Sequence, residues 1–226
     1  MKRIKSRFTL IEMLAVAAIA SILIALMTPA VQAMLFGSRV DNYISNFKLG
    51  MERAQSEAVA ARKYVAMILP TKHKVNDKPE LKPYCKGGYR LAYVKKDGSS
   101  YKWDSWVEEW KNPNDGAMLV SVAETAPTAA PAVPGEAIFG TLLEKVDSLP
   151  SADIGSACES NPALIFSPYG GVMNRDKELY FTFTEAKFND GDDSYELPNS
   201  DNFLVLKLNP VTGRISYFDP YKAAAE

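Results

Sequence analysis

The feature that most constrains this chain is an apolar run near its start, Phe8 to Met27, in which Glu12 is the only formally charged residue. Four basic residues stand just before the run: Lys2, Arg3, Lys5 and Arg7. About 20 residues at a rise of 1.5 Å are enough to cross the hydrocarbon core of a membrane. Basic flanks stay on the cytoplasmic side. The run therefore predicts one membrane-spanning helix with a cytoplasmic N-terminus.

A cleaved secretory signal is the alternative interpretation of the same run. Val31-Gln32-Ala33 offers small residues at suitable positions, and the cut would follow Ala33. The apolar core of a signal peptide is normally about 7 to 15 residues long, however, and this run is longer and carries a carboxylate near its start. Both features favour a helix that is retained.

The sequence after Pro29 continues as an amphipathic helix. Apolar residues recur at spacings of three and four, which places them on one helical face. These residues are Val40, Ile44, Phe47, Met51, Ala54, Ala58, Ala61 and Val65. The pattern predicts one long helix whose second half packs on a folded head, with a bend at Pro29 because proline cannot donate the helical hydrogen bond.

Several stretches of the chain resemble a known group of proteins. Residues 8–12, FTLIE, followed by an apolar helix, a proline and an amphipathic continuation, resemble the N-terminus of the type IV pilins and the pseudopilins of type II secretion. Residues 39–58, the segment LIFSPYGG at 164–171 and the segment NPVTGRI at 209–215 are similar to the minor pseudopilin group that contains GspH and FimT.

The resemblance implies how the N-terminus is processed and used. A prepilin peptidase would cut between Arg7 and Phe8 and methylate the new N-terminus, and Glu12 would face the amino group of a neighbouring subunit. A carboxylate in lipid costs roughly a few kcal/mol unless it is paired, so this contact would set the register of assembly. The family usually has Gly where this chain has Arg7. Either the peptidase accepts Arg7 or the leader is kept; we expect cleavage, because the rest of the motif is intact.

The remaining sequence predicts a β-rich head. Strand-like segments are Tyr64 to Leu69, Gly88 to Lys95, Met118 to Ala123, Ala163 to Ser167, Glu178 to Thr184, Phe203 to Leu208 and Arg214 to Phe218. The turn at 209–213 should join the last two as a hairpin, and Thr125 to Pro134 should be an exposed loop. The expected fold is α+β: a basic leader (1–7), a transmembrane helix (8–36), its amphipathic continuation (37–66) and an antiparallel β-sheet head (67–226).

Three features of the head could carry a function or only structure. Trp103, Trp106 and Trp110, at spacings of three and four, would share one face of a helix, and packing is the favoured explanation over a partner or sugar site. The acidic run at 189–196 has oxygen ligands suited to calcium but lacks the EF-hand spacing, so a solvated loop is favoured. Arg214 resembles the start of a DNA-binding motif of some FimT relatives, but Ile215 and Ser216 follow, which favours a turn and strand start.

The chain has few residues suited to catalysis or metal binding. It contains one histidine, His73, and two cysteines far apart in sequence, Cys85 and Cys158. This leaves little for a His-centred triad, a Cys/His pair or a zinc site, while an enzyme built on carboxylates alone stays possible. With the family resemblance, we expect no enzyme activity, no metal and no cofactor. In an oxidising compartment Cys85 and Cys158 would pair if the fold brings them together, and a bridge closing so long a loop would contribute about 4 kcal/mol in the chain-entropy model.

The predicted function is that of a minor pilin or pseudopilin in a type II secretion pseudopilus or a type IV pilus-like filament. Expected partners are other pilin subunits, prepilin peptidase and the inner membrane, with the head on the periplasmic side. The net charge of −1 gives no reason to expect DNA as a partner. A DNA-binding subunit for uptake is the first alternative, and a secreted β-domain hydrolase cut after Ala33 is the second.

Overall fold

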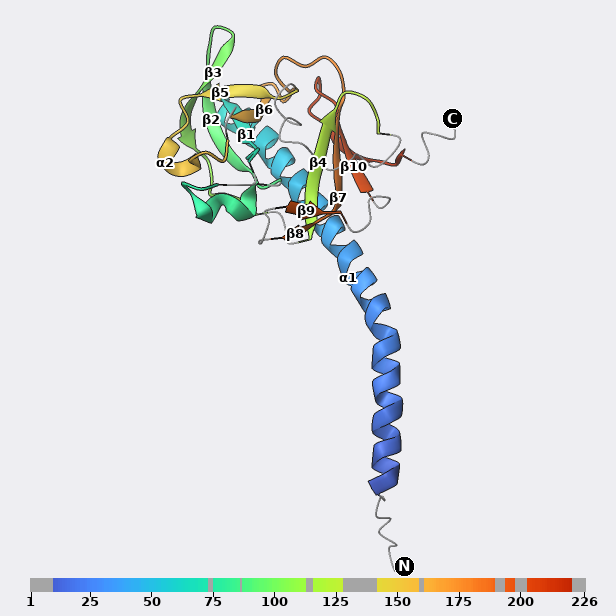
Figure 1. The fold of residues 1–226 in the computed structure, drawn as a ribbon. Helices are drawn as coiled ribbons and strands as arrows, with labels where there is room; N and C mark the ends of the chain where they lie inside the picture. Colours follow the sequence, from blue (N-terminus) through green and yellow to red (C-terminus); the bar gives the residue numbers. More distant parts are fainter. Residues whose placement is uncertain are drawn as a thin grey trace, which may run out of the picture. The chain divides into compact units, whose positions relative to one another are not determined.

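The computed structural model describes residues 10–72, 75–85, 87–112, 116–127, 142–158, 161–189, 194–197 and 203–220, with the side chains of 29–38, 187–189 and 194–195 left out. The chain divides into two compact units, Met1–Ser38 and Arg39–Glu226. Helix α1, Leu10–Ala61, contributes to both (Figure 1). Its helical hydrogen bonding is assigned through Pro29 without a break, and the bend expected there stays a prediction.

The end of α1 is marked by a residue in the left-handed conformation. Arg62 has φ of 55°, and the Lys63 amide donates a 3.2 Å hydrogen bond to the Ala58 carbonyl, which closes the last turn. Strand β1, Tyr64–Ile68, starts directly afterwards. The helix and the first strand of the head are therefore joined with almost no loop.

Five strands of the head form a closed barrel in the order β1-β2-β3-β5-β6. Besides β1, these are β2 (Arg90–Asp97), β3 (Ser100–Trp106), β5 (Glu144–Asp147) and β6 (Pro162–Phe166). Neighbouring strands are antiparallel except for β3 and β5, which are parallel. Closure pairs every strand on both sides, so this sheet has no free edge.

A second sheet has the order β11-β10-β7-β4, and all its pairs are antiparallel. Its strands are β4 (Ala117–Ala123), β7 (Leu179–Glu185), β10 (Phe203–Leu208) and β11 (Ile215–Phe218). The short strands β8 (Lys187–Asn189) and β9 (Ser194–Glu196) pair with each other. Two short helical segments, η1 (Pro79–Tyr84) and α2 (Ser151–Ile154), complete the described elements.

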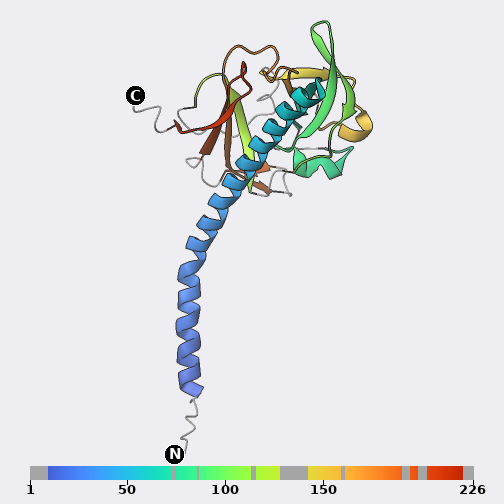
Figure 2. The ribbon, with the colours of Figure 1, turned by 180° about the vertical axis from the view of Figure 1, so that it is seen from behind.

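The head-bound half of α1 packs with one face against both sheets, and Figure 2 shows the head from the side where the helix is in front. Its apolar stripe shares one core with side chains from both sheets, including Met67 and Phe166 of the barrel and Phe181 and Leu206 of the second sheet. The predicted stripe residues from Val40 to Ala58 are all buried. Because every turn of the helix contributes to this core, the helix is the element that joins the two sheets.

The α+β class predicted from the sequence is confirmed. Every predicted strand is present, and β10 and β11 form the expected hairpin. The strands β3, β5, β8 and β9 were not predicted. Of the predicted loop at 125–134, residues 125–127 are described and lie outside any strand, and the rest lies outside the described residues.

Candidate assembly sites

The first half of α1 exposes an apolar surface around its whole circumference. Each residue from Leu10 to Thr28 is exposed, with large side chains such as Ile11 (75% exposed) among them. Among the described residues this is the one helix long and apolar enough to cross a membrane, although a signal sequence near an N-terminus would have the same length and composition. The segment therefore needs a membrane, a partner or both to cover it.

Two hydroxyl side chains in this half form hydrogen bonds within the helix itself. The Ser21 hydroxyl donates to the Ala17 carbonyl at 2.8 Å, and the Thr28 hydroxyl donates to the Ile24 carbonyl at 2.7 Å. Such bonds to the carbonyl four residues earlier let a hydroxyl enter an apolar medium without losing its hydrogen bond. The hydroxyls of Ser21 and Thr28 are thus compatible with lipid.

Glu12 lies in the first turn of α1 and is exposed. A carboxylate at this end of a helix interacts favourably with the helix dipole, so the local structure suits an acid there. Arg7 and Phe8, the expected cleavage and methylation residues, lie outside the described residues. The roles of these three residues remain predictions.

Gln55 of α1 joins the two loops that carry the family-like signatures of the head. Its side-chain amide donates to the Gly170 carbonyl at 2.8 Å and to the Thr212 carbonyl at 2.9 Å. Gly170 belongs to the segment 164–171 and Thr212 to the segment 209–215. The three stretches that resemble the GspH and FimT group therefore meet at one place, and sequence reasoning did not single out Gln55 as the residue that connects them.

The loop at 209–213 is shaped by side-chain hydrogen bonds and a required glycine. The Asn209 carboxamide oxygen accepts from the Val211 amide (3.1 Å) and the Thr212 amide (3.0 Å). Gly213 has φ of 67°, and a Cβ there would lie 2.1 Å from the Gly170 carbonyl oxygen. Strand β11 starts at Ile215. The expectation that Gly213-Arg214 forms a turn and a strand start is confirmed.

The prediction that the three tryptophans share a helical face is wrong. Trp103 and Trp106 lie on strand β3, and Trp110 follows it. The rings still meet, with centroids 5.9 Å apart for Trp103 and Trp106 and 6.4 Å for Trp106 and Trp110. The Trp106 indole donates to the Asp153 carboxylate at 2.8 Å, and the Arg90 guanidinium lies 4.1 Å above its ring. The favoured packing role agrees with these contacts.

Cys85 and Cys158 are both buried, and neither forms a disulfide in this structure. Burial raises the pKa of the Cys158 thiol, and the nearby Cys85 raises it further. A thiol with a raised pKa is a poor nucleophile, since the thiolate is the reactive form. The expected disulfide between the two stays a prediction.

The remaining polar candidates gain no support as a catalytic or metal site from the described part of the chain. Shifted carboxyl pKa values occur at Asp77, Asp97, Asp104 and Glu178, and each is lowered chiefly by a side-chain hydrogen bond. A general acid would instead need a raised pKa. His73 and the centre of the acidic run, 190–193, lie outside the described residues, while the ends of that run belong to β8 and β9 and not to a loop.

Comparison with known proteins gives structural neighbours only. No family model and no curated protein matches the chain. Among solved structures it is similar to the type IV minor pilin FimU of Pseudomonas aeruginosa (13% identity, 81% of this chain and 91% of that chain, TM-score 0.42). It is also similar to the minor pseudopilin EpsH of Vibrio cholerae in two structures, at 11% and 12% identity, each with a TM-score of 0.37, over 80% and 81% of this chain and 98% and 95% of those chains. At such identities the likeness concerns the fold alone.

Proposed function

We propose that this chain is a structural minor pilin or pseudopilin subunit of a type II secretion pseudopilus or a type IV pilus-like filament. The observation that carries the proposal is the motif at residues 8–12 leading into α1, whose apolar first half is exposed and whose second half is buried in the head. A helix built in this way can leave the membrane by exchanging lipid contacts for contacts with neighbouring subunits. The role is structural and needs no cofactor.

The proposed topology is a single pass through the inner membrane, with a cytoplasmic N-terminus and a periplasmic head. The basic residues before Phe8 support this orientation. Prepilin peptidase would remove residues 1–7 and methylate Phe8. Mass spectrometry of the mature N-terminus tests this step: the expected chain begins at methylated Phe8, whereas a chain beginning at Met34 would show a signal peptidase cut and would contradict the whole proposal.

The assembly role of Glu12 is tested by a substitution that keeps its size. Glu12→Gln removes the charge, so recruitment by the amino terminus of a neighbouring subunit should be lost while membrane insertion is kept. The measurement is crosslinking of the full chain to the other filament subunits in cells. Glu52→Gln is a matched control, because Glu52 lies on the head-bound half of α1 and pairs with Lys48 one turn away at 3.1 Å. Wild-type recruitment of the Glu12→Gln protein would rule out the assembly role.

A periplasmic head also makes the redox state of the cysteines testable. In an oxidising compartment Cys85 and Cys158 should form a disulfide, and reducing it should lower the free energy of unfolding by about 2–4 kcal/mol. The measurement is alkylation of the denatured, non-reduced protein, which separates a disulfide from two buried thiols. Two alkylated cysteines under these conditions would refute the pairing, and Cys85→Ser with Cys158→Ser supplies the matched bond-free chain.

A further inference from the structure

A hollow of about 250 Å³ lies within the head beside α1. The helix lines one wall with Asn46, Leu49 and Arg53, and the opposite wall includes Tyr89, Lys111 and Asn112. Leu49 is 60% exposed although it is a large apolar residue, whereas Phe47 and Met51 beside it in the sequence are buried in the core. The hollow therefore combines amides, cations and an apolar side chain along one edge of the helix.

Two glycines give this hollow its shape. A Cβ at Gly50 would lie 2.3 Å from the Tyr89 ring, and a Cβ at Gly87, which has φ of 109°, would lie 1.5 Å from the Tyr43 hydroxyl oxygen. Glycine is among the least favoured residues inside a helix, so Gly50 has a steric reason to be there. Both glycines let aromatic rings lie close to the backbone, and these rings form part of the lining.

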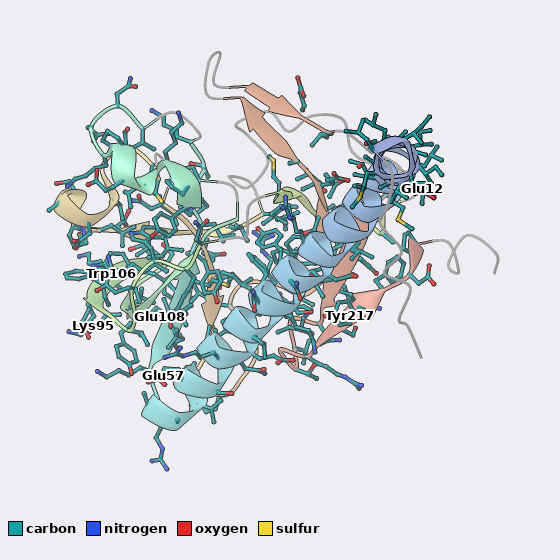
Figure 3. The ribbon with its side chains drawn as sticks, turned by 90° about the horizontal axis from the view of Figure 1, so that it is seen from below. Glu12, Glu57, Lys95, Trp106, Glu108 and Tyr217 are labelled. Atoms are coloured by element: carbon teal, nitrogen blue, oxygen red, sulfur yellow. The ribbon has the colours of Figure 1, made fainter. Side chains whose placement is uncertain are left out.

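Next to the hollow, one buried carboxylate lies between two half-exposed cations. The Glu108 side chain is 7% exposed, with Oε2 2.7 Å from Arg53 Nη1 and 3.7 Å from Lys111 Nζ. The Arg53 and Lys111 side chains are 57% and 47% exposed. Figure 3 places Glu108 on one side of α1 and Tyr217 on the other. One negative and two positive groups leave a net positive charge at the mouth of the hollow.

The ion pair with Glu108 occupies only part of the Arg53 guanidinium, because it is Nη1 that lies 2.7 Å from the Glu108 carboxylate. A guanidinium has five N–H donors in a planar fork that matches a carboxylate. Burial, followed by the charge of Glu108, raises the pKa of Tyr89 to about 12, so its phenol also keeps its proton as a donor.

We infer that this hollow binds an acidic side chain, Asp or Glu, of a partner polypeptide. Arg53 and Lys111 receive the carboxylate, the amide of Asn46 is placed to contact the adjoining peptide backbone, and Leu49 covers an apolar neighbour. The complementary charge selects an acidic over a neutral segment. The inference rests on the head alone and does not depend on the filament role, so the Glu12 test and this one fail independently.

The test uses the ¹⁵N-labelled full chain in detergent micelles and two probe peptides, acetyl-Leu-Glu-amide and acetyl-Leu-Gln-amide. The Glu probe should shift the amide resonances of Gly50, Tyr89 and Asn112 saturably, and the Gln probe should bind at least tenfold more weakly. Equal binding of the two probes, or shifts confined to other parts of the head, would overturn the inference.

Variants of the charged groups make the test specific. Arg53→Gln and Lys111→Gln should each lower the affinity for the Glu probe at least tenfold. Glu108→Gln should raise that affinity, because it removes a competing negative charge. Lys177→Gln is the matched control, since Lys177 is also an exposed cation paired with a carboxylate, Glu124, at 3.2 Å. If Arg53→Gln perturbs the spectrum of the whole head, Glu108→Gln decides: weaker or unchanged binding of the Glu probe by that variant would refute the site.

Discussion

The two halves of helix α1 differ both in apolar content and in surroundings. From Leu10 to Thr28 every residue is exposed, whereas the stripe from Val40 to Ala58 is buried against two sheets. In the second half the apolar residues keep a spacing of three and four, because only one face meets the core. In the first half they surround the helix, as is typical of a helix that is covered on all sides. One half of the helix therefore packs on the head of its own chain, and the other half is suited to contacts with molecules outside the chain.

This comparison predicts that truncating a large apolar side chain to alanine destabilises the head only in the head-bound half of the helix. Phe47 is 1% exposed and its ring packs against Phe183, with centroids 5.1 Å apart. Phe47→Ala should lower the free energy of unfolding of the head by about 3–5 kcal/mol, because it opens a cavity in the shared core. Denaturant unfolding of the full chain in detergent, followed by tryptophan fluorescence, measures the head alone, since all three tryptophans lie in it.

Leu23→Ala is the matched truncation in the other half. Leu23 is 53% exposed and lies in the candidate membrane span. Leu23→Ala should change the free energy of unfolding of the head by no more than about 0.5 kcal/mol, the range typical of substitutions away from a core. A loss for Leu23→Ala comparable to that of Phe47→Ala would mean that the two halves are energetically one unit, and the comparison would fail.

A polar contact on the head-bound half should have the next largest effect. Gln55→Glu replaces the amide that donates to the Gly170 and Thr212 carbonyls by a carboxylate, which has no donor and faces two carbonyl oxygens. We expect a loss of about 2–3 kcal/mol, from two broken hydrogen bonds and the repulsion that replaces them. Ser56→Ala, at the exposed neighbouring position, should be nearly neutral. The same denaturant unfolding experiment measures both variants. An unchanged free energy of unfolding for Gln55→Glu would show that the two loops hold their positions without the helix.

The head-bound half of α1 was the most predictable part of the molecule, and the reason is physical. Burial on one face forces a 3.6-residue period, so the stripe could be identified before any partner was known. The strand β10 was equally clear from its short run of mostly apolar residues, FLVLKL. The resemblance at residues 8–12 similarly pointed to Glu12, but no single chain can show the neighbouring subunit that would test its role.

Strand β3 shows where the same reasoning failed. The tryptophans on and after it stand three and four residues apart, which matches a helical period, but the preceding Gly98-Ser99 is a hairpin signal that outweighs it. Gly98 has the φ of 61° that such a turn requires, and Ser100 pairs with Asp97 across β2 and β3. Strand β5 could not have been found in this way, because its parallel pairing with β3 joins segments far apart in sequence.

The hollow beside α1 also could not be predicted from the sequence. Arg53 lies on α1, whereas Glu108 and Lys111 stand together after β3, and nothing in the sequence indicates that these two segments meet. One signal was present in Gly50, since a glycine inside a strongly amphipathic helix calls for a steric explanation. The structure gives that explanation as the ring of Tyr89, but only the folded head shows that this ring borders a hollow.

The smallest effect is expected on the solvent side of the head-bound half. Lys48 pairs with Glu52 one turn along the helix at 3.1 Å, and its ammonium lies 5.6 Å from the centre of the Tyr217 ring. Exposed pairs of this kind contribute about 0.3–0.5 kcal/mol, because water screens the attraction and two long side chains lose freedom. Lys48→Gln should therefore lower the unfolding free energy by about 0.5 kcal/mol or less, and the loss should fade in 1 M salt, where the Debye length falls to about 3 Å.

A double-mutant cycle with Glu52→Gln separates the ion pair from the ring contact. If the pair dominates, Lys48→Gln in the Glu52→Gln background should cost almost nothing; if the contact with Tyr217 dominates, the cost should persist in both backgrounds. A loss above about 1.5 kcal/mol in either background would mean that the solvent side of this half also holds the head together. The contrast between the two halves would then depend on the whole circumference of the helix and not on its buried stripe.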